Sequence, residues 1–113
     1  MNELNIAKVR GQFGTEYSFR WFHIPKEASR IPKSGGIYIV AKAEAPLEGE
    51  PTIEGLFLGE SKDFSSALQA HPQQACFEKQ GANIIGVLPL PNPEAAIPIK
   101  FDLSALVWPC GIA

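Results

Sequence analysis

Glycine and proline divide this chain into short segments. Ten residues of each type occur among 113 residues, and proline interrupts both the interior of a helix and the hydrogen-bonded middle of a sheet. A chain of this length forms one domain by default, and 45% of its residues are hydrophobic, which is enough for a core. We therefore expect a single domain, residues 1–113, of short strands, short helices and frequent turns.

Alternation of apolar and polar residues predicts strands at 4–10 and 15–22, and a stretch rich in β-branched residues predicts one at 35–42. Two further strands are predicted at 52–59 and 82–90. The first two flank the glycine-rich sequence GQFG and form an N-terminal β-hairpin within residues 1–24. On this hairpin, Tyr17, Phe19 and Trp21 share one face. We expect the later strands to form one sheet, with the third and fourth joined as a long-looped hairpin. The N-terminal hairpin would extend that sheet or cover its edge.

A helix is predicted shortly after Gly59. Side chains recur there at helical spacing, and they are Phe64, Ala67, Leu68 and His71. Ser61 or Asp63 would cap the first turn by accepting a hydrogen bond from a backbone N–H. Pro72 ends this helix or opens the next one, which Gly81 terminates.

A further short helix is predicted near the end of the sequence. Pro98 occupies its first turn, where the missing N–H of proline is harmless. Its apolar face comprises Ile99, Leu103, Leu106 and Val107. Trp108 would anchor this helix. The order of elements indicates an α+β domain whose small antiparallel or mixed sheet is flanked by helices.

The charge balance provides no general affinity for nucleic acid. Ten basic and twelve acidic residues leave a formal net charge of −2, whereas nucleic-acid binding relies on basic groups that displace counterions from phosphates. A local basic surface would have to supply the affinity. Its candidates, all in the first part of the chain, are Lys8, Arg10, Arg20, Arg30 and Lys33.

Cysteine and hydropathy patterns bear on the compartment. Cys76 and Cys110 form no CxxC pair, and the chain has only two histidines, so a zinc site is not expected. No apolar run approaches the roughly 20 residues of a membrane span, and the N-terminus lacks the apolar core of a signal peptide. We therefore expect a cytoplasmic protein without membrane association. In that reducing compartment the two cysteines would be free thiols, and the alternative is a disulfide between them.

Several short motifs resemble the GIY-YIG endonuclease domain. GIY stands at 36–38, FLG at 57–59 and GAN at 81–83. From residue 13 to residue 111 the chain is similar to a group of small stand-alone bacterial proteins that contain this domain. The core of the likeness is 35–111, and the resemblance implies a small sheet with flanking helices.

The resemblance also implies a reaction and its residues. In the family, two tyrosines lie near a metal-bound water and the scissile phosphate, an arginine neutralises that phosphate, and a glutamate holds a divalent cation. Tyr38 keeps the first tyrosine, Gly59 keeps the glycine of the second motif, and His71 matches a helix histidine. The other positions have changed: Phe57 replaces the second tyrosine, Ala67 the arginine, and Ile99 or Lys100 the glutamate. A hydroxyl, a guanidinium and a carboxylate are thus absent from the motif.

Three functions are compatible with these observations. The first is a catalytically degenerate module that acts by binding a protein partner or another copy of itself, without a cofactor. The second is a remodelled nuclease in which Asp102 or Glu94 holds Mg²⁺. The third is a non-cleaving nucleic-acid-binding protein. The combined loss of three catalytic groups favours the first.

Overall fold

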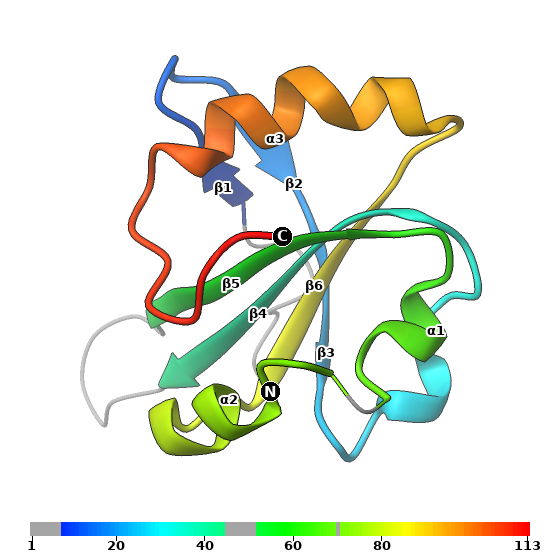
Figure 1. The fold of residues 1–113 in the computed structure, drawn as a ribbon, viewed down its shortest axis with the longest axis vertical. Coiled ribbons are helices and arrows are strands. Elements are labelled where there is room, and N and C mark those ends of the chain that lie inside the picture. The colour runs from blue at the N-terminus through cyan, green and yellow to red at the C-terminus, as the bar shows by residue number, and fades with distance from the viewer. Residues whose placement is uncertain (1–7, 45–51, 70) are drawn as a thin grey trace.

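The computed structural model describes residues 8–44, 52–69 and 71–113, and they form an α+β fold (Figure 1). Its strands are β1 (Lys8–Arg10), β2 (Glu16–Ser18), β3 (Arg20–His23), β4 (Gly36–Glu44), β5 (Thr52–Ser61) and β6 (Ile84–Pro89). Its helices are α1 (Phe64–Ala67), α2 (Gln74–Gln80) and α3 (Ala96–Ser104), with short 3₁₀ turns η2 (Ala28–Arg30) and η3 (Pro93–Ala95). The predicted fold class is confirmed. Within the described residues, no helix has the length and apolar character of a membrane span.

Four strands form an antiparallel sheet in the order β3-β6-β4-β5. β4 pairs with β5 on one side and with β6 on the other, so Tyr38 lies opposite both Gly59 and Val87. β4 and β5 are the predicted long-looped hairpin, whose connection at 45–51 lies outside the described residues. The expectation that these predicted strands share one sheet is confirmed.

The N-terminal hairpin is shorter than predicted. β1 and β2 pair through Val9 and Tyr17 in a two-stranded sheet of their own, while residues 4–7 lie outside the described part of the chain. The remainder of the predicted second strand, β3, pairs with β6 and extends the main sheet. The predicted shared face is confirmed, because Tyr17, Phe19 and Trp21 all pack into the same core cluster.

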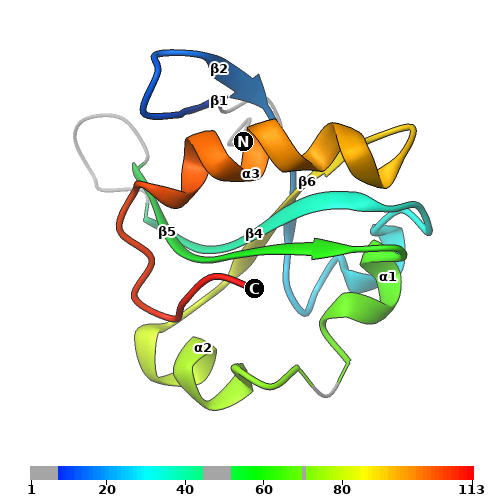
Figure 2. The same ribbon diagram turned by 45° about the horizontal axis from the view of Figure 1, so that its top comes forward.

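The main sheet is covered on both faces (Figure 2). α3 and the β1–β2 hairpin lie on one face, and α1 and α2 lie on the other. Side chains of β4 alternate between the two sides, since Ile37 and Ile39 pack with residues of α3, whereas Tyr38 and Val40 pack with residues of α1 and α2. Burial on both faces explains why the sequence GIYIVA is apolar without interruption.

Two tryptophans lie close against glycines of the sheet. A Cβ atom on Gly86 would lie 2.7 Å from the Trp21 ring, and one on Gly55 would lie 2.6 Å from the Trp108 ring. The indole N–H of Trp108 also donates to the Leu103 carbonyl at 2.9 Å. This bond ties the chain after α3 back to the helix, which confirms the predicted anchoring role of Trp108.

α1 is shorter than the helix predicted after Gly59. Asp63, one of the two predicted caps, accepts a hydrogen bond from the Ser65 N–H at 3.0 Å. The predicted helical face continued to His71, but the helix ends at Ala67. A residue that precedes proline is biased away from helical backbone angles, and Pro72 follows His71.

The ends of the two later helices, α2 and α3, agree only in part with the predictions from the sequence. Gly81 terminates α2 as predicted, with a φ of 80°, and α3 carries Pro98 in its first turn. α3 ends at Ser104, so Leu106 and Val107 lie beyond it and are exposed. The predicted apolar face is wrong for these two residues, because the chain turns away from the helix axis before it reaches them.

The cysteines form a disulfide instead of two free thiols. Cys76 on α2 is bonded to Cys110, and their Cα atoms are 5.8 Å apart. Cys110 lies beside α2 because its N–H donates to the Leu56 carbonyl at 2.7 Å, which lays the last residues along β5. The expectation of free thiols is wrong for this structure, because it rested on the compartment and not on the path of the chain.

Candidate functional site

Tyr38 is held close against β5. It lies opposite Gly59 in the β4–β5 ladder, and a Cβ atom at Gly59 would lie 2.6 Å from the Tyr38 ring and 2.8 Å from the Phe57 ring. Tyr38 is only 4% exposed. This burial raises the pKa of Tyr38 to about 12, so its hydroxyl is protonated at neutral pH.

His71 fixes the hydrogen bonding of this hydroxyl. The Gln73 backbone N–H donates to Nδ1 of His71 at 2.9 Å, so the neutral imidazole carries its proton on Nε2. Nε2 lies 2.9 Å from the Tyr38 hydroxyl oxygen and donates to it. The hydroxyl therefore accepts this bond and retains its own hydrogen for a second partner.

Aromatic rings surround His71. Its ring centre lies 4.8 Å from the ring centre of Phe57 and 4.8 Å from that of Phe77. Burial lowers the pKa of the imidazole, because the charged form would lose its hydration. His71 is thus a neutral histidine with both nitrogens in hydrogen bonds, and it positions Tyr38.

Four of the predicted site residues line one cleft of about 340 Å³: Tyr38, Phe57, Ala67 and His71. Gly59 lies against the Tyr38 ring, and residues 110–113 also contribute to the lining. Glu60 is the only charged side chain among the lining residues that the structure describes. We refer to this space as the Tyr38 cleft. Among its described lining residues, the polar side chains are Tyr38, Glu60, Ser61, His71 and Gln73, and the remainder of the lining is aromatic or apolar.

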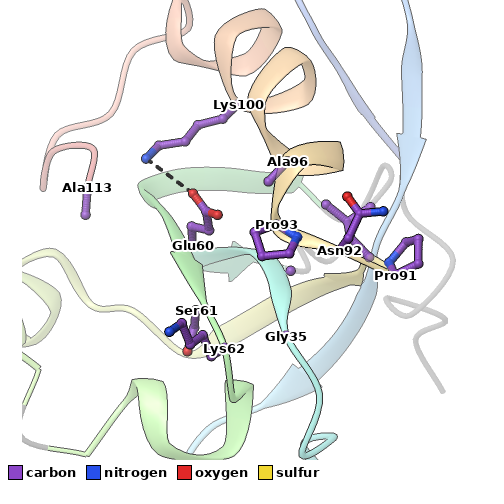
Figure 3. Close-up of a pocket in the computed structure, with 12 residues that line it drawn as sticks. Gly35, Glu60, Ser61, Lys62, Pro91, Asn92, Pro93, Ala96, Lys100 and Ala113 are labelled. Carbon is purple, nitrogen blue, oxygen red and sulfur yellow. Dashed lines mark ion pairs between the residues drawn. The ribbon is translucent and has the colours of Figure 1, made fainter.

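A second cavity of about 460 Å³ adjoins the Tyr38 cleft, and Glu60 lines both (Figure 3). Lys100 extends from α3 towards Glu60, and its Nζ lies 3.9 Å from the carboxylate. Lys62 lines the same cavity. Of the two residues that the resemblance aligns with the family glutamate, Lys100 lines this cavity, whereas Ile99 packs against the core on the α3 side.

The two carboxylates considered as replacement metal ligands, Asp102 and Glu94, do not belong to the described lining of the Tyr38 cleft. Asp102 is 3% exposed, and it accepts hydrogen bonds from the Phe13 N–H at 2.9 Å and the Tyr17 hydroxyl at 2.7 Å. It therefore holds the β1–β2 turn on α3, and its hydrogen bond raises the pKa of Tyr17. Glu94 is exposed in η3. Within the described ranges, no group of three or more His, Cys, Asp and Glu side chains is placed to hold a metal ion.

The five basic residues considered as nucleic-acid contacts are all exposed: Lys8, Arg10, Arg20, Arg30 and Lys33. Arg10 forms an ion pair with Glu16 at 2.9 Å, and Arg30 forms one with Glu27 at 3.1 Å. Acidic neighbours thus reduce the positive charge of the group. None of the five belongs to the described lining of the Tyr38 cleft.

Sequence reasoning missed several parts of this site. Gln73 acts through its backbone N–H and Glu60 stands at the exposed end of a strand, so neither position has a periodic signal. The return of residues 110–113 to β5 left no pattern in the sequence either. Asn83, in the GAN motif, has a structural role, because its side chain exchanges hydrogen bonds of 2.7 and 3.0 Å with the backbone of Ala43.

Comparison with known proteins identifies no relative of this chain. No protein-family model, no curated protein and no solved structure matches it. The resemblance to the GIY-YIG domain therefore rests on the sequence motifs and on their order and spacing, without support from any matched protein.

Proposed function

We propose that this protein is a catalytically degenerate GIY-YIG-type module that acts by binding, and that its partner is another protein. The observation that carries the proposal is the chemistry of the Tyr38 cleft. Its described lining holds one carboxylate, Glu60, and a buried neutral histidine, His71. A phosphodiester placed in the cleft would meet a negative charge and no cation from these residues.

Cleavage of a phosphodiester requires stabilisation of the negative charge on the phosphoryl oxygens. Ala67 lines the cleft where the resemblance assigns an arginine, and a methyl group cannot supply that stabilisation. Lys100, in the adjoining cavity, is paired with Glu60 at 3.9 Å. The loss of one such group costs on the order of 10²–10³ in rate, which supports binding without cleavage.

A protein partner suits the charge of the molecule better than a nucleic acid does. The net charge of −2 opposes a polyanion, and Arg10 and Arg30 are paired with acidic neighbours. Aromatic and apolar walls with a few polar groups match the composition of protein interfaces. A cytoplasmic location and independence of any cofactor belong to the same proposal.

The first test concerns cleavage. Purified protein with Mg²⁺ or Mn²⁺ is incubated with single-stranded and double-stranded DNA and RNA, and we expect no product above background. We also expect labelled oligonucleotides to show no change in fluorescence anisotropy at low salt. Metal-dependent cleavage that disappears in Tyr38→Phe would contradict the proposal.

The second test concerns the partner. A photoreactive amino acid in place of Ala67 reports on molecules that enter the Tyr38 cleft, and Val107, 85% exposed and outside the cleft lining, provides the control position. In a lysate of the source cells, we expect position 67 to yield a discrete protein adduct, whose mass distinguishes a second copy from another chain. Adducts with nucleic acid, or the same adducts at both positions, would refute this assignment.

A further inference from the structure

The last residues, 110–113, cover the free edge of the main sheet, and we call them the closing segment. β5 is an edge strand, with β4 as its neighbour in the sheet. On the other side, the Cys110 N–H donates to the Leu56 carbonyl at 2.7 Å, and the Ala113 N–H donates to the Leu58 carbonyl at 2.9 Å. Figure 1 shows this segment running beside β5. A single isolated parallel bridge, between Leu58 and Ile112, joins it to β5.

Few noncovalent contacts of the backbone hold the closing segment. Its pairing with β5 is completed by the Leu58 N–H, which donates to the Gly111 carbonyl at 3.2 Å. Strand pairs this short are marginal in water. The Cys110 side chain, however, is 6% exposed within the core cluster on the α2 side and is bonded to Cys76 on α2. The disulfide therefore clamps the closing segment between α2 and β5.

We propose that the outer edge of β5 is a peptide-binding edge under redox control. The closing segment fills it while the Cys76–Cys110 disulfide is intact, and an extended peptide of a partner protein fills it after a dithiol has reduced that disulfide. This inference rests on the proposed function, because it specifies how a protein partner binds and what regulates the binding.

The closing segment indicates which peptide fits. An extended strand would use the same backbone groups of Leu56 and Leu58, and it would place a small side chain where Cys110 enters the core. Addition of a strand to a sheet edge is a general mode of peptide recognition. Because the closing segment also lines the Tyr38 cleft, its departure exposes the Tyr38 hydroxyl on the same side as the vacated edge.

The redox step is a thiol–disulfide exchange. A thiolate of the dithiol attacks the sulfur of Cys76, which is the less buried of the two cysteines, and Cys110 leaves as a thiolate that takes up a proton. The second thiol of the reductant then attacks the mixed disulfide and releases Cys76. Two electrons and two protons thus pass to the protein, and the dithiol becomes a disulfide. In a reducing compartment, a disulfide is usually a transient, redox-sensing one.

We call the disulfide-held pairing of the closing segment with β5 the clasp. Amide hydrogen exchange, measured by NMR on the oxidised and the dithiothreitol-reduced protein, tests the clasp without any partner. We expect the amides of Cys110 and Leu58 to exchange at least tenfold faster after reduction. The amides of Ile39 and Val40 in the central strand β4 should also lose protection as global stability falls, but they should remain much better protected than Cys110 and Leu58. Unchanged exchange at Cys110 and Leu58, or exchange of Ile39 and Val40 as fast as theirs in the reduced protein, would overturn the clasp.

A peptide probe tests the binding edge. The probe is a fluorescein-labelled peptide with the sequence of residues 107–113 carrying Cys110→Ser. We expect it to bind the reduced protein and the Cys76→Ser variant at least tenfold more tightly than the oxidised protein. A probe methylated on the backbone nitrogen of Ala113, which donates to Leu58, should bind less tightly. Equal affinity for oxidised and reduced protein, or no effect of methylation, would overturn the edge assignment.

The two tests separate this inference from the proposed function. The exchange experiment involves no ligand, so a negative result removes the clasp and leaves binding at the Tyr38 cleft intact. A nuclease activity found in the cleavage test would remove the proposed function, and the exchange result would then stand on its own.

Discussion

Gly59 determines where the Tyr38 ring lies, because a Cβ atom at this position would come within 2.6 Å of that ring. We expect Gly59→Ala to displace Tyr38 from His71 and to lower the free energy of unfolding by about 1–3 kcal/mol, the usual cost of overpacking. Urea denaturation measures this change. Repeating the substitution in a Tyr38→Ala background should reduce the cost to the part that the Phe57 ring, 2.8 Å away, still imposes, and an undiminished cost there would disprove the contact with Tyr38.

His71 makes the stability of the protein depend on pH. Its folded pKa is lowered by burial, so the unfolded chain takes up a proton before the native protein does, and acid favours unfolding. We expect the free energy of unfolding to be highest above about pH 6.5, the unfolded pKa of histidine, and to decline below it until the lowered pKa is passed. Denaturation curves across this range measure the decline. In His71→Gln, the side chain can still donate to Tyr38 but does not titrate, so the part of the decline that His71 causes should be absent. Identical dependence of stability on pH in the wild-type protein and the variant would exclude His71 as the cause.

Ala67 lines the cleft, and it is the simplest position at which to ask whether a reaction has been lost. We expect Ala67→Arg alone to remain inactive, since catalytic groups act as a unit and their effects are not additive. The smallest combination worth assaying is Phe57→Tyr, Ala67→Arg and Lys100→Glu, because Lys100 lines the adjoining cavity. Metal-dependent DNA cleavage by Ala67→Arg itself would mean that a working metal site already exists.

At the scale of elements, the β1–β2 hairpin depends on a residue of α3. Strands of three residues are marginal alone, and Asp102 supplies the tie by accepting hydrogen bonds from Phe13 and Tyr17. We expect Asp102→Ala to lower the free energy of unfolding by about 1–3 kcal/mol, because two partly buried donors lose their acceptor. Backbone amide shifts should move throughout β1 and β2. Tyr17→Phe, which removes one donor and keeps the other, should have the smaller effect, and the reverse order would contradict this role.

The elements themselves were predictable where local chemistry decides them. Apolar stretches bounded by turn residues located β4 and β6, Asp63 marked the start of α1, and Gly81 marked the end of α2. The end of α1 and the exposed Val107 depend on the path of the chain around His71 and after Ser104, which periodicity does not encode. The cleft was predictable from the motifs only as a set of positions, because the hydrogen bond from Gln73 to His71 exists only after folding.

At the scale of the whole molecule, the disulfide is the long-range link that the sequence left open. It joins residues 34 positions apart, and a loop of that length corresponds to about 3–4 kcal/mol of stabilisation. We expect Cys76→Ser to fold, with a free energy of unfolding about 3–4 kcal/mol lower than that of the oxidised protein, as measured by urea denaturation. The reduced wild-type protein should have the same stability as this variant. A variant as stable as the oxidised protein would show that the link adds nothing to stability.

The placement of the two tryptophans decides what fluorescence can report. Trp21 and Trp108 both pack on the α3 side of the sheet, whereas Tyr38, His71 and the disulfide lie on the other side. Tryptophan emission therefore reports mainly on the packing of the α3 side of the sheet, and it responds little to changes in the layer of α1 and α2. Tyr17 also packs on the α3 side, so the matching probe of the other layer is Tyr38 in a Tyr17→Phe variant, where it is the one remaining tyrosine. In that variant, an unfolding curve followed by tryptophan emission and one followed by tyrosine absorbance will coincide only if both layers are lost together.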